Sequence, residues 1–291
     1  RGLSYLEKGM GRRWRQLGVT STMTDRVELL IDDLDGQGYG VGFCANDHRP
    51  IRVWGCTLGD RLIVRIIHRS PHRLVGQIDQ VIEPGERHAV RCPHRPDCGG
   101  CPQWEENDKA LTDWRVRELK SALPWLTVTP LAALPRKAWR TRSKWWVTRH
   151  NDAIRFEVPR PRSNKGLAIP ECPILPPQSQ NRLALLKEQL TASEFKSVHA
   201  LVLTHGTATT NDMAPFGIGL IAAAPPPSSP RVVGQAGDAV AWLEQTQRSP
   251  QLFSGQVTHL SGPSCVAVEV GSSLLPTPPF AFVQAHPQGR E

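Results

Sequence analysis

Short apolar runs separated by turn-forming residues fill the first part of the chain. After Met23 the β-rich runs are RVELLI, YGVGF, IRVW, RLIVRII and RLVGQIDQVI. Several short strands at this spacing are typical of a small β-barrel. The glycines of DGQGYGVG fit neither common phosphate-loop pattern, so we interpret them as a turn that enters a curved strand. The pattern predicts a barrel over residues 23–84. Residues 1–22 are basic and lack hydrophobic alternation, and we expect them to be a disordered tail.

The periodicity becomes helical in WEENDKALTDWRVRELKSAL, where Leu111 and Trp114 fall on one face and Asp113 is placed to pair with Arg117. Strands are expected at SKWWVT, AIRFEV, VHALVLT, QVTHL and SCVAVEV, and a second helix at NRLALLKEQL. The stretch AAAPPPSSP indicates a loop. Together these elements predict an α+β fold, in which an OB-like barrel is followed by a central α+β domain over residues 85–280.

The composition is that of a globular protein, with 39% hydrophobic and 21% charged residues in a chain of 291. No window approaches the run of about eighteen apolar residues that a membrane span needs. The first residues include arginines but no apolar signal-peptide core. We therefore expect a cytoplasmic monomer with no membrane partner. In a reducing cytoplasm the seven cysteines are not expected to form disulfides.

The positive charge of the chain is concentrated in one segment. The formal net charge is +8, which favours an anionic partner. Between Arg136 and Lys165 there are ten lysines and arginines but only two acids, Asp152 and Glu157. The excess within this segment equals that of the whole chain. The anion-binding part of the protein is therefore expected here rather than after residue 200, where only three arginines remain.

Three of the seven cysteines lie within ten residues, in the spacing Cys92-x5-Cys98-x2-Cys101. Two glycines separate the second and third thiols and allow a tight turn around a ligand. Cys172, in IPECPILPP, is the next candidate ligand. Four cysteines of this form are typical of an iron–sulfur cluster, while tetrahedral zinc, which could also recruit His94, is the alternative. Spacing alone does not separate these two sites, and unliganded core thiols fit poorly with so polar a loop.

The order of a small barrel, C-P-H-R-P-D-C-G-G-C, W-R-T-R-S-K, E-C-P-I-L-P-P and F-V-Q resembles the SAM-dependent RNA (uracil-5-)methyltransferases with an N-terminal TRAM domain, the group that includes the enzymes forming 5-methyluridine in 23S rRNA. The resemblance runs from about residue 25 to the end of the chain. It implies that the barrel is an RNA-binding TRAM domain. It also assigns a 4Fe-4S cluster to the four thiols Cys92, Cys98, Cys101 and Cys172. The other cysteines, Cys44, Cys56 and Cys265, have no motif partner and are expected to be buried thiols.

The resemblance places an RNA-binding surface in the central domain, and the local sequence agrees with it. Arg140, Arg142 and Lys144 are spaced two apart, so on a strand they would share one face. Trp145 and Trp146 would point to opposite faces, which leaves Trp146 available to stack on a base. The alternative is a solvated basic strand with both indoles in the core. We expect ribosomal RNA to be the partner.

In the resembling family the methyl transfer occurs in a C-terminal Rossmann-like domain with an S-C-N-P nucleophile motif, and we expect this domain to be absent. Ser264-Cys265 is followed by Val266-Ala267 instead of N-P, so we reject Cys265 as the nucleophile and assign no catalytic residue. Residues 281–291 would be the start of the missing domain. The resemblance assigns Gln284 to S-adenosyl-L-methionine (SAM), although the asparagine usual two residues later is replaced by His286.

Two functions are therefore expected. The chain is either the RNA-binding and cluster-bearing front part of a uracil-5 methyltransferase, inactive by itself, or a complete RNA-binding iron–sulfur or zinc protein that does not methylate.

Overall fold

The structure is a computed structural model. It describes residues 26–44, 47–129, 135–151, 153–161, 163–207, 212–228, 233–245 and 253–283, with the side chains of Cys44 and Asp47 left undescribed. The chain divides into two compact units. The first comprises Arg1–Pro96 and Cys101–Ala133, and the second Asp97–Gly100 and Leu134–Glu291. The expected tail, residues 1–22, and the expected SAM contact, Gln284, lie outside the described residues.

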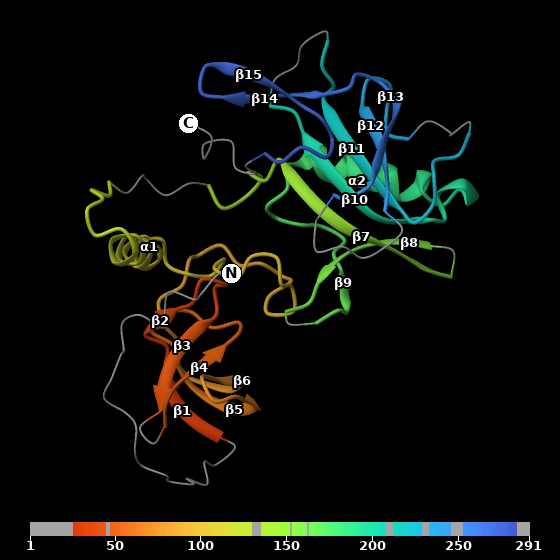
Figure 1. Cartoon of the computed structure of the whole chain (residues 1–291). Coiled ribbons are helices and arrows are strands. Elements are labelled where there is room, and N and C mark those ends of the chain that lie inside the picture. Colours follow the sequence, from red (N-terminus) through yellow and green to blue (C-terminus); the bar gives the residue numbers. More distant parts are fainter. Residues whose placement is uncertain are drawn as a thin grey trace. The chain divides into compact units, whose positions relative to one another are not determined.

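The first unit is built on a six-stranded sheet with the order β1-β5-β6-β4-β3-β2, in which only β4 and β6 pair in parallel. Its strands are β1 (Arg26–Leu30), β2 (Asp33–Leu34), β3 (Gly40–Cys44), β4 (Asp47–Val53), β5 (Arg61–Arg69) and β6 (Leu74–Glu83). The two edge strands, β1 and β2, are separated along the chain by only Ile31 and Asp32. The sheet therefore curls until its edges approach one another, as in a barrel (Figure 1). All five β-rich runs read from the sequence in this region are strands.

The interior of this curled sheet is filled by alternating strand positions. On β5, Leu62 and Val64 are fully buried, while Arg61 and Arg65 on either side of them are exposed and Ile63 between them is partly exposed. This period of two places every second residue inside. The glycine-rich entry to β3 is a turn, as expected, because the Asp35 carboxylate accepts hydrogen bonds from the backbone N–H groups of Gln37 and Tyr39.

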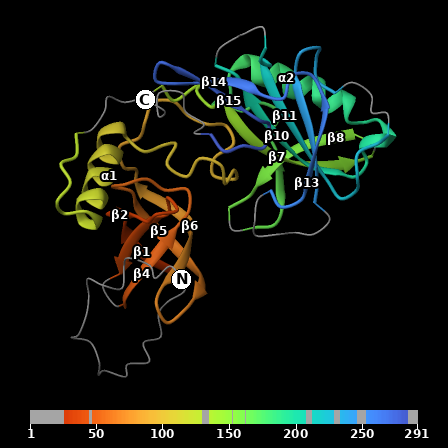
Figure 2. The same cartoon turned by 45° about the horizontal axis from the view of Figure 1, so that its top comes forward.

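Helix α1 (Asp108–Ala122) lies beside β2 (Figure 2). Its Leu111 and Trp114 pack with Leu34 of β2. Its first turn is capped by the Asn107 side chain, which accepts from the backbone N–H groups of residues 109 and 110. The Trp114 indole Nε1 donates to the carboxylate of Asp33 at 2.9 Å. A buried aromatic anchor and a cap thus fix where this helix begins and which face it buries.

The pairing expected within this helix is wrong. Asp113 pairs with Lys109 (Nζ to Oδ2, 2.6 Å), one turn towards the N-terminus, rather than with Arg117. Arg117 instead reaches Asp33, at 2.6 Å. An aspartate on a helix can reach partners at both i−4 and i+4. Here the Asp33 carboxylate on β2 binds Arg117, and Asp113 pairs with Lys109 instead.

The second unit contains a seven-stranded sheet of order β13-β12-β11-β10-β7-β8-β9, antiparallel except between β11 and β12. Its strands are β7 (Arg142–His150), β8 (Ala153–Pro159), β9 (Gly166–Ala168), β10 (Val198–His205), β11 (Phe216–Ala222), β12 (Ala239–Glu244) and β13 (Gln256–Ser261). A separate hairpin is formed by β14 (Val266–Val270) and β15 (Ser273–Thr277). The remaining elements are α2 (Pro177–Gln189) and a short 3-10 helix, Ser193–Phe195.

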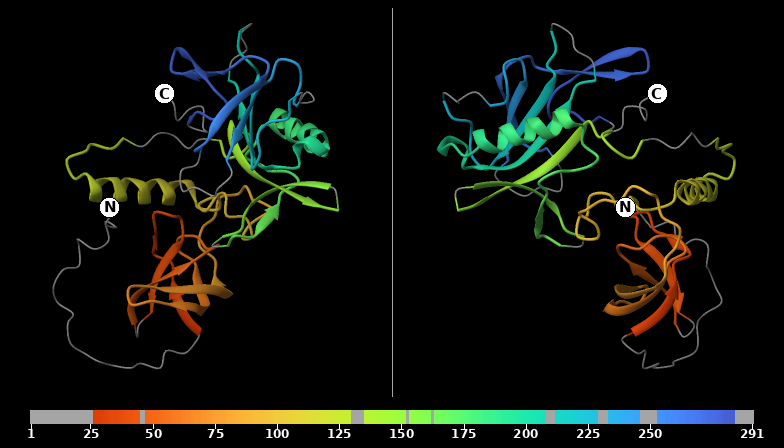
Figure 3. Two further views of the ribbon diagram at one scale, coloured as in Figure 1. Left: turned by 45° about the vertical axis from the view of Figure 1, so that its right-hand side comes forward. Right: turned by 180° about the vertical axis from the view of Figure 1, so that it is seen from behind.

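Helix α2 covers one face of this sheet (Figure 3). Leu186 and Leu190 are fully buried against strand residues such as Trp242. A buried ion pair adds a polar tie, since Arg182 Nη1 lies 2.8 Å from Asp238 Oδ2 and both side chains are almost inaccessible. Because a buried charge is costly without its partner, this pair fixes α2 relative to the segment that precedes β12.

The predicted loop at residues 222–230 is confirmed where it is described. Ala222 is the last residue of β11, residues 223–228 belong to no helix or strand, and residues 229–230 lie outside the described chain. Within the described residues, neither helix has the length and apolar character needed to cross a membrane.

Candidate functional site

The cysteine-rich segment is a long loop whose base is closed in the first unit. Arg87 and Glu106 form an antiparallel bridge, and the backbone N–H of His88 donates to the carbonyl of Glu105 at 3.0 Å. Beneath the bridge, the buried Asp60 carboxylate pairs with Arg87 Nη2 at 2.7 Å. Asp60 also accepts from the backbone N–H of Gly85 at 2.7 Å. This buried carboxylate, whose hydrogen bonds are satisfied, therefore anchors the start of the loop to the curled sheet.

Glu106 closes the other side of the base and has an unusual environment. Its side chain is 1% exposed and accepts a hydrogen bond from the backbone N–H of Leu58 at 3.1 Å. Burial raises the pKa of Glu106 from its ordinary value of 4.5 to about 7, because the charged form is poorly solvated. The nearby Asp60 carboxylate raises the pKa further, while Arg87 opposes the shift.

Arg95, in the first part of the loop, is held by the curled sheet. Its guanidinium lies 5.0 Å from the centroid of the Trp54 ring, and the Trp54 indole donates to the carbonyl of Pro96 at 2.8 Å. Arg95 Nη2 donates to the carbonyl of Pro102 at 3.2 Å. The other two nitrogens, Nε and Nη1, are buried and have no hydrogen-bond partner in the described structure. Sequence reasoning missed this residue, because a lone arginine in a polar loop carries no periodicity or motif.

The tip of the loop, Asp97–Gly100, belongs to the second unit. The backbone N–H of Gly99 donates to the carbonyl of Pro159 at 3.1 Å, and Arg160 Nη1 lies 3.2 Å from Asp97 Oδ1. A Cβ atom on Gly99 would lie 2.8 Å from the Pro159 oxygen, too close for any side chain. The N–H of Gly100 donates to the sulfur of Cys98 at 3.3 Å. Gly99 is therefore needed as a glycine in this turn, while Gly100 contributes its backbone N–H to the Cys98 sulfur.

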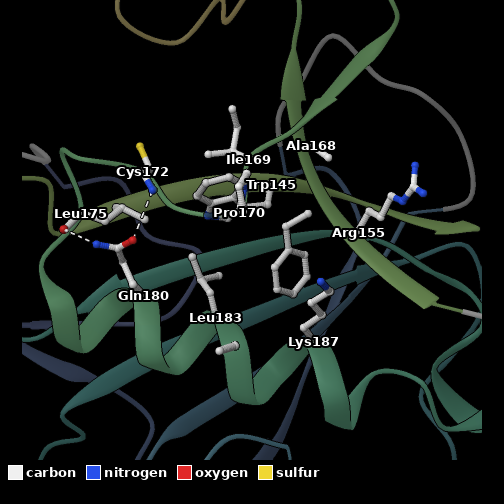
Figure 4. A pocket seen from close by; sticks show the side chains of 12 residues that line it. Trp145, Arg155, Ala168, Ile169, Pro170, Cys172, Leu175, Gln180, Leu183 and Lys187 are labelled. Atoms are coloured by element: carbon white, nitrogen blue, oxygen red, sulfur yellow. Dashed lines mark hydrogen bonds between the residues drawn. The ribbon is translucent and has the colours of Figure 1, made fainter. Parts of the chain in front are cut away.

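Cys172 lies in a second turn of the same unit. Its backbone N–H donates to Gln180 Oε1 at 3.3 Å, and the Gln180 amide donates to the carbonyl of Leu175 at 3.4 Å (Figure 4). The N–H of Leu175 in turn donates to the carbonyl of Cys172. A single glutamine on α2 therefore holds the turn of E-C-P-I-L in shape.

A pocket of about 330 Å³ borders this turn (Figure 4). Its walls are largely apolar and include Trp145 and Phe156, and two cations, Arg155 and Lys187, also line it. This volume is at the lower end for ligand pockets. Its lining includes Cys172, one of the four candidate metal ligands.

The four cysteines assigned to a cluster divide between the units. Cys92 and Cys101 belong to the first unit, and Cys98 and Cys172 to the second. All four side chains are partly exposed, and none is in a disulfide. Among the described residues, no group of three or more His, Cys, Asp or Glu side chains is gathered as a metal ion requires.

The remaining cysteines differ from one another. Cys56 is 2% exposed, and burial raises the pKa of its thiol to about 12, so it is an inert core thiol, as expected. Cys265 is partly exposed rather than buried. The side chain of Cys44 is not among those described.

The predicted RNA-binding residues are not equally available. Arg142 Nη1 donates to Thr204 Oγ1 at 2.7 Å and to the carbonyl of Pro279 at 3.1 Å. Burial lowers the pKa of Arg142 to about 10. Arg140 precedes β7, and its Nε donates to the carbonyl of Arg142 at 2.9 Å. Lys144 is exposed, with its ammonium 5.7 Å from the Phe253 ring centroid.

The two tryptophans of β7 face opposite sides of the sheet, as predicted. Trp145 is 4% exposed and packs in the core beneath α2, and its indole donates to Ser143 Oγ at 2.9 Å. Trp146 is half-buried on the same face as Lys144. The part of this face that can meet a ligand is therefore formed by Lys144 and Trp146 rather than by Arg142.

Comparison with known proteins relates the chain to RNA methyltransferases. The 23S rRNA (uracil(1939)-C(5))-methyltransferase RlmD of Dichelobacter nodosus is 29% identical over 188 residues, which are 61% of this chain and 43% of that protein. RlmD of Bordetella pertussis is 27% identical over 177 residues. The homologues are RlmD-type 23S rRNA uracil-C5 methyltransferases. An uncharacterized RNA methyltransferase of Caldanaerobacter subterraneus, TTE1797, is 42% identical over a shorter stretch of 77 residues, 26% of this chain and 16% of that protein.

The fold agrees with this relationship. The crystal structure of the Pyrococcus abyssi tRNA (uracil-54, C5)-methyltransferase in complex with S-adenosyl-L-homocysteine matches with a TM-score of 0.65. The match covers 90% of this chain and 62% of that one, at 19% identity, and therefore establishes a shared fold. The chain spans less than half the length of the RlmD relatives it matches. No protein-family model matches the chain.

Proposed function

We propose that the chain is the RNA-binding and cluster-bearing part of a SAM-dependent RNA uracil-C5 methyltransferase that modifies ribosomal RNA in the cytoplasm. The observation that carries this proposal is the match of 188 residues to an RlmD enzyme. The curled sheet of the first unit would be the TRAM domain. SAM would be the methyl donor of the whole protein, and Gln284 the residue of this chain that contacts it.

A 4Fe-4S cluster held by Cys92, Cys98, Cys101 and Cys172 is part of this proposal. The donor set fits, because all four are thiols, and thiolates are the usual ligands of such clusters. The N–H of Gly100 already donates to the Cys98 sulfur, and hydrogen bonds of this kind tune bound clusters. The two buried Arg95 nitrogens without acceptors also fit, since a cluster with four thiolates is an anion. When bound, the cluster would cross-link segments far apart in the sequence, which is a structural role.

Metal content tests the cluster directly. Protein purified without oxygen should be brown and contain about four irons per chain. Cys98→Ser and Cys172→Ser should each lose iron, while Cys265→Ser, a matched change at another partly exposed thiol, should keep it. Stoichiometric zinc without visible absorbance would contradict the cluster and favour the tetrahedral zinc site.

RNA binding tests the rest of the proposal. The iron-loaded chain should bind a structured fragment of 23S rRNA with an affinity that falls steeply as salt rises, since phosphate contacts release counterions. The measurement is fluorescence anisotropy of labelled RNA at several salt concentrations. Affinity no greater than that of an unrelated acidic-surface protein would reject RNA as the partner.

A further inference from the structure

The pocket beside the Cys172 turn has an apolar floor formed by two aromatic side chains (Figure 4). Trp145 of β7 and Phe156 of β8 both line the pocket, and their ring centroids lie 6.4 Å apart. Both side chains are buried members of the core that α2 covers. Because core side chains are held by packing on several sides, this floor is rigid. A rigid apolar floor can bind the hydrocarbon part of a ligand without rearranging.

One wall of the pocket is a single stripe of helix α2. Its lining residues recur at i, i+3, i+4 and i+7, the spacing of one helix face, and are Gln180, Leu183, Ala184 and Lys187. Seven residues of α-helix rise about 10 Å, so the pocket extends that far along α2. Ala184 and Lys187 are exposed, so the pocket is open to solvent along this stripe. An elongated pocket of this length suits a short hydrocarbon chain.

The pocket is positively charged at one end. Lys187 of α2 and Arg155 of β8 line it there, on the side away from Cys172 (Figure 4). Among the described residues that line the pocket, none is an aspartate or a glutamate. Neither of the two cationic side chains makes a hydrogen bond or an ion pair within the part of the chain that the structure describes. Their charge is therefore available to an anionic group of a ligand.

The opposite end of the pocket is the turn that carries Cys172. Gln180 lines the pocket and also holds this turn, since it accepts from the N–H of Cys172 at 3.3 Å and donates to the carbonyl of Leu175 at 3.4 Å. Leu175 itself lines the pocket. A ligand in the pocket would therefore contact α2 and the turn at the same time, and would restrain the turn.

We propose that this pocket binds a small organic carboxylate with an apolar body. The hydrocarbon part would lie over Trp145 and Phe156, and the carboxylate would meet Lys187 and Arg155 in charge-assisted hydrogen bonds. An inorganic anion would leave the aromatic floor uncovered, and an uncharged hydrocarbon would leave the two cations without a partner. An apolar lining with a few polar groups is usual for small-molecule sites, and the volume of about 330 Å³ suits a ligand of this size. The site uses residues of the second unit alone and does not rest on the proposed function.

Equilibrium dialysis of radiolabelled octanoate against the whole chain tests the site. The competitors are octanamide, which has the same hydrocarbon chain but no charge, and acetate, which has the charge but no long chain. We expect a single saturable site, from which each competitor displaces octanoate about tenfold less effectively than unlabelled octanoate does. Because Gln180 links the pocket to the turn, bound octanoate should also slow hydrogen exchange of the backbone from Cys172 to Leu175.

A charge-removing double variant tests the positive end of the pocket. Lys187→Gln with Arg155→Gln should weaken octanoate binding about tenfold, because the carboxylate loses both cations. Lys165→Gln with Lys196→Gln is the matched control. These two lysines are exposed on the second unit and are not among the lining residues, so their loss should leave octanoate binding unchanged.

A pocket-filling variant tests the apolar part. Ala184→Trp should abolish octanoate binding, because position 184 is exposed and lines the pocket. Gln178→Trp, at an exposed position of α2 outside the lining, is its control and should bind octanoate normally. Circular dichroism checks that all variants are folded. The proposal would be overturned by the absence of saturable binding, by equal displacement with octanamide, or by full binding to a folded Ala184→Trp protein.

Discussion

The guanidinium of Arg95 is stacked on Trp54, with Cζ 5.0 Å from the ring centroid, while two of its nitrogens remain buried without an acceptor. A buried cation with unfilled donors costs free energy unless an anion approaches. Glu106 is one nearby acid, because Arg95 acts to lower its pKa, but it makes no hydrogen bond to the two nitrogens. In the proposed cluster-bearing protein, the thiolate-bound iron–sulfur group would be the anion that they meet, since Arg95 lies midway between Cys92 and Cys98 in sequence. The metal-free and metal-loaded forms should therefore respond in opposite ways when this charge is removed.

Arg95→Met keeps the length of the side chain and its contact with Trp54 but removes the charge. We expect the iron-free chain to melt at a higher temperature, because an unsatisfied buried charge is gone. The iron-loaded chain should instead release iron faster to a chelator, because the cluster loses a hydrogen-bonding cation. Thermal melting and the rate of iron release measure the two effects.

Arg91→Met is the matched control for Arg95→Met, since the Arg91 side chain is exposed and its ion pair with Glu105 is long, at 3.9 Å. It should change neither melting nor iron release by a comparable amount. If Arg95→Met lowers the melting temperature of the iron-free chain and leaves iron release unchanged, Arg95 has a purely packing role.

Arg142→Ala should lower the stability of the second unit more than it weakens RNA binding. The change leaves the buried Thr204 hydroxyl and the Pro279 carbonyl without their donor, and we expect a loss of about 2 to 3 kcal/mol in the free energy of unfolding. Lys144→Ala, on the same face of β7 but exposed, should cost little stability and should weaken RNA binding if this face meets RNA. Urea unfolding and RNA anisotropy separate the two. A stable Arg142→Ala protein with impaired RNA affinity would show that the internal contacts are not the role of Arg142.

Glu106 predicts a pH dependence of the first unit. Its pKa is raised to about 7 in the folded state from an ordinary value of 4.5, so between these values the folded chain keeps a proton that the unfolded chain releases. Stability should therefore fall as the pH rises from 5 to 8, by up to about 3 kcal/mol relative to Glu106→Gln, whose side chain does not titrate. Urea unfolding at several pH values checks this. Glu83→Gln, at an exposed carboxylate, is the control and should leave the profile unchanged.

The fold could be predicted from sequence where burial alternates. On β5 and β7 the two faces differ in polarity, so the strands and the opposite facing of Trp145 and Trp146 were predictable. The strands β11 and β12 were missed, because nearly all of their residues are buried and no alternation marks them. A continuous apolar run bounded by turns is compatible with a buried strand but equally with part of a helix.

The sequence predicts the residue types of the candidate site but not the contacts around them. Thiol spacing singles out Cys92, Cys98 and Cys101 as candidate metal ligands, and this assignment stays a prediction, since no metal-binding group is gathered among the described residues. The spacing of residues in the sequence does not show that Arg142 donates a hydrogen bond to Thr204, or that Arg49 lies beside the turn of Ser70. Both contacts depend on the order of the strands in the sheets. The parallel pairing of β4 with β6, which brings Arg49 beside the turn of Ser70, leaves no trace in the local sequence.

Gly219, in the fully buried strand β11, shows why a glycine interrupts this apolar run. A Cβ atom built there would lie 2.5 Å from Cε1 of Phe280, whose ring covers the strand and also packs on Phe253 with centroids 5.5 Å apart. Gly219→Ala should therefore displace the ring and destabilise the second unit by about 1 to 3 kcal/mol.

Because the added Cβ clashes with one side chain, shortening that side chain should relieve the clash. Phe280→Leu alone should cost stability through lost aromatic contact, yet the double variant should be more stable than the sum of the two single losses predicts, with a coupling of at least about 0.5 kcal/mol. Gly36→Ala is the control, since a Cβ there meets nothing within 4 Å. Urea unfolding of the four proteins provides the cycle. Strictly additive losses would mean that the cost of Gly219→Ala comes from the backbone at this position rather than from the contact with Phe280.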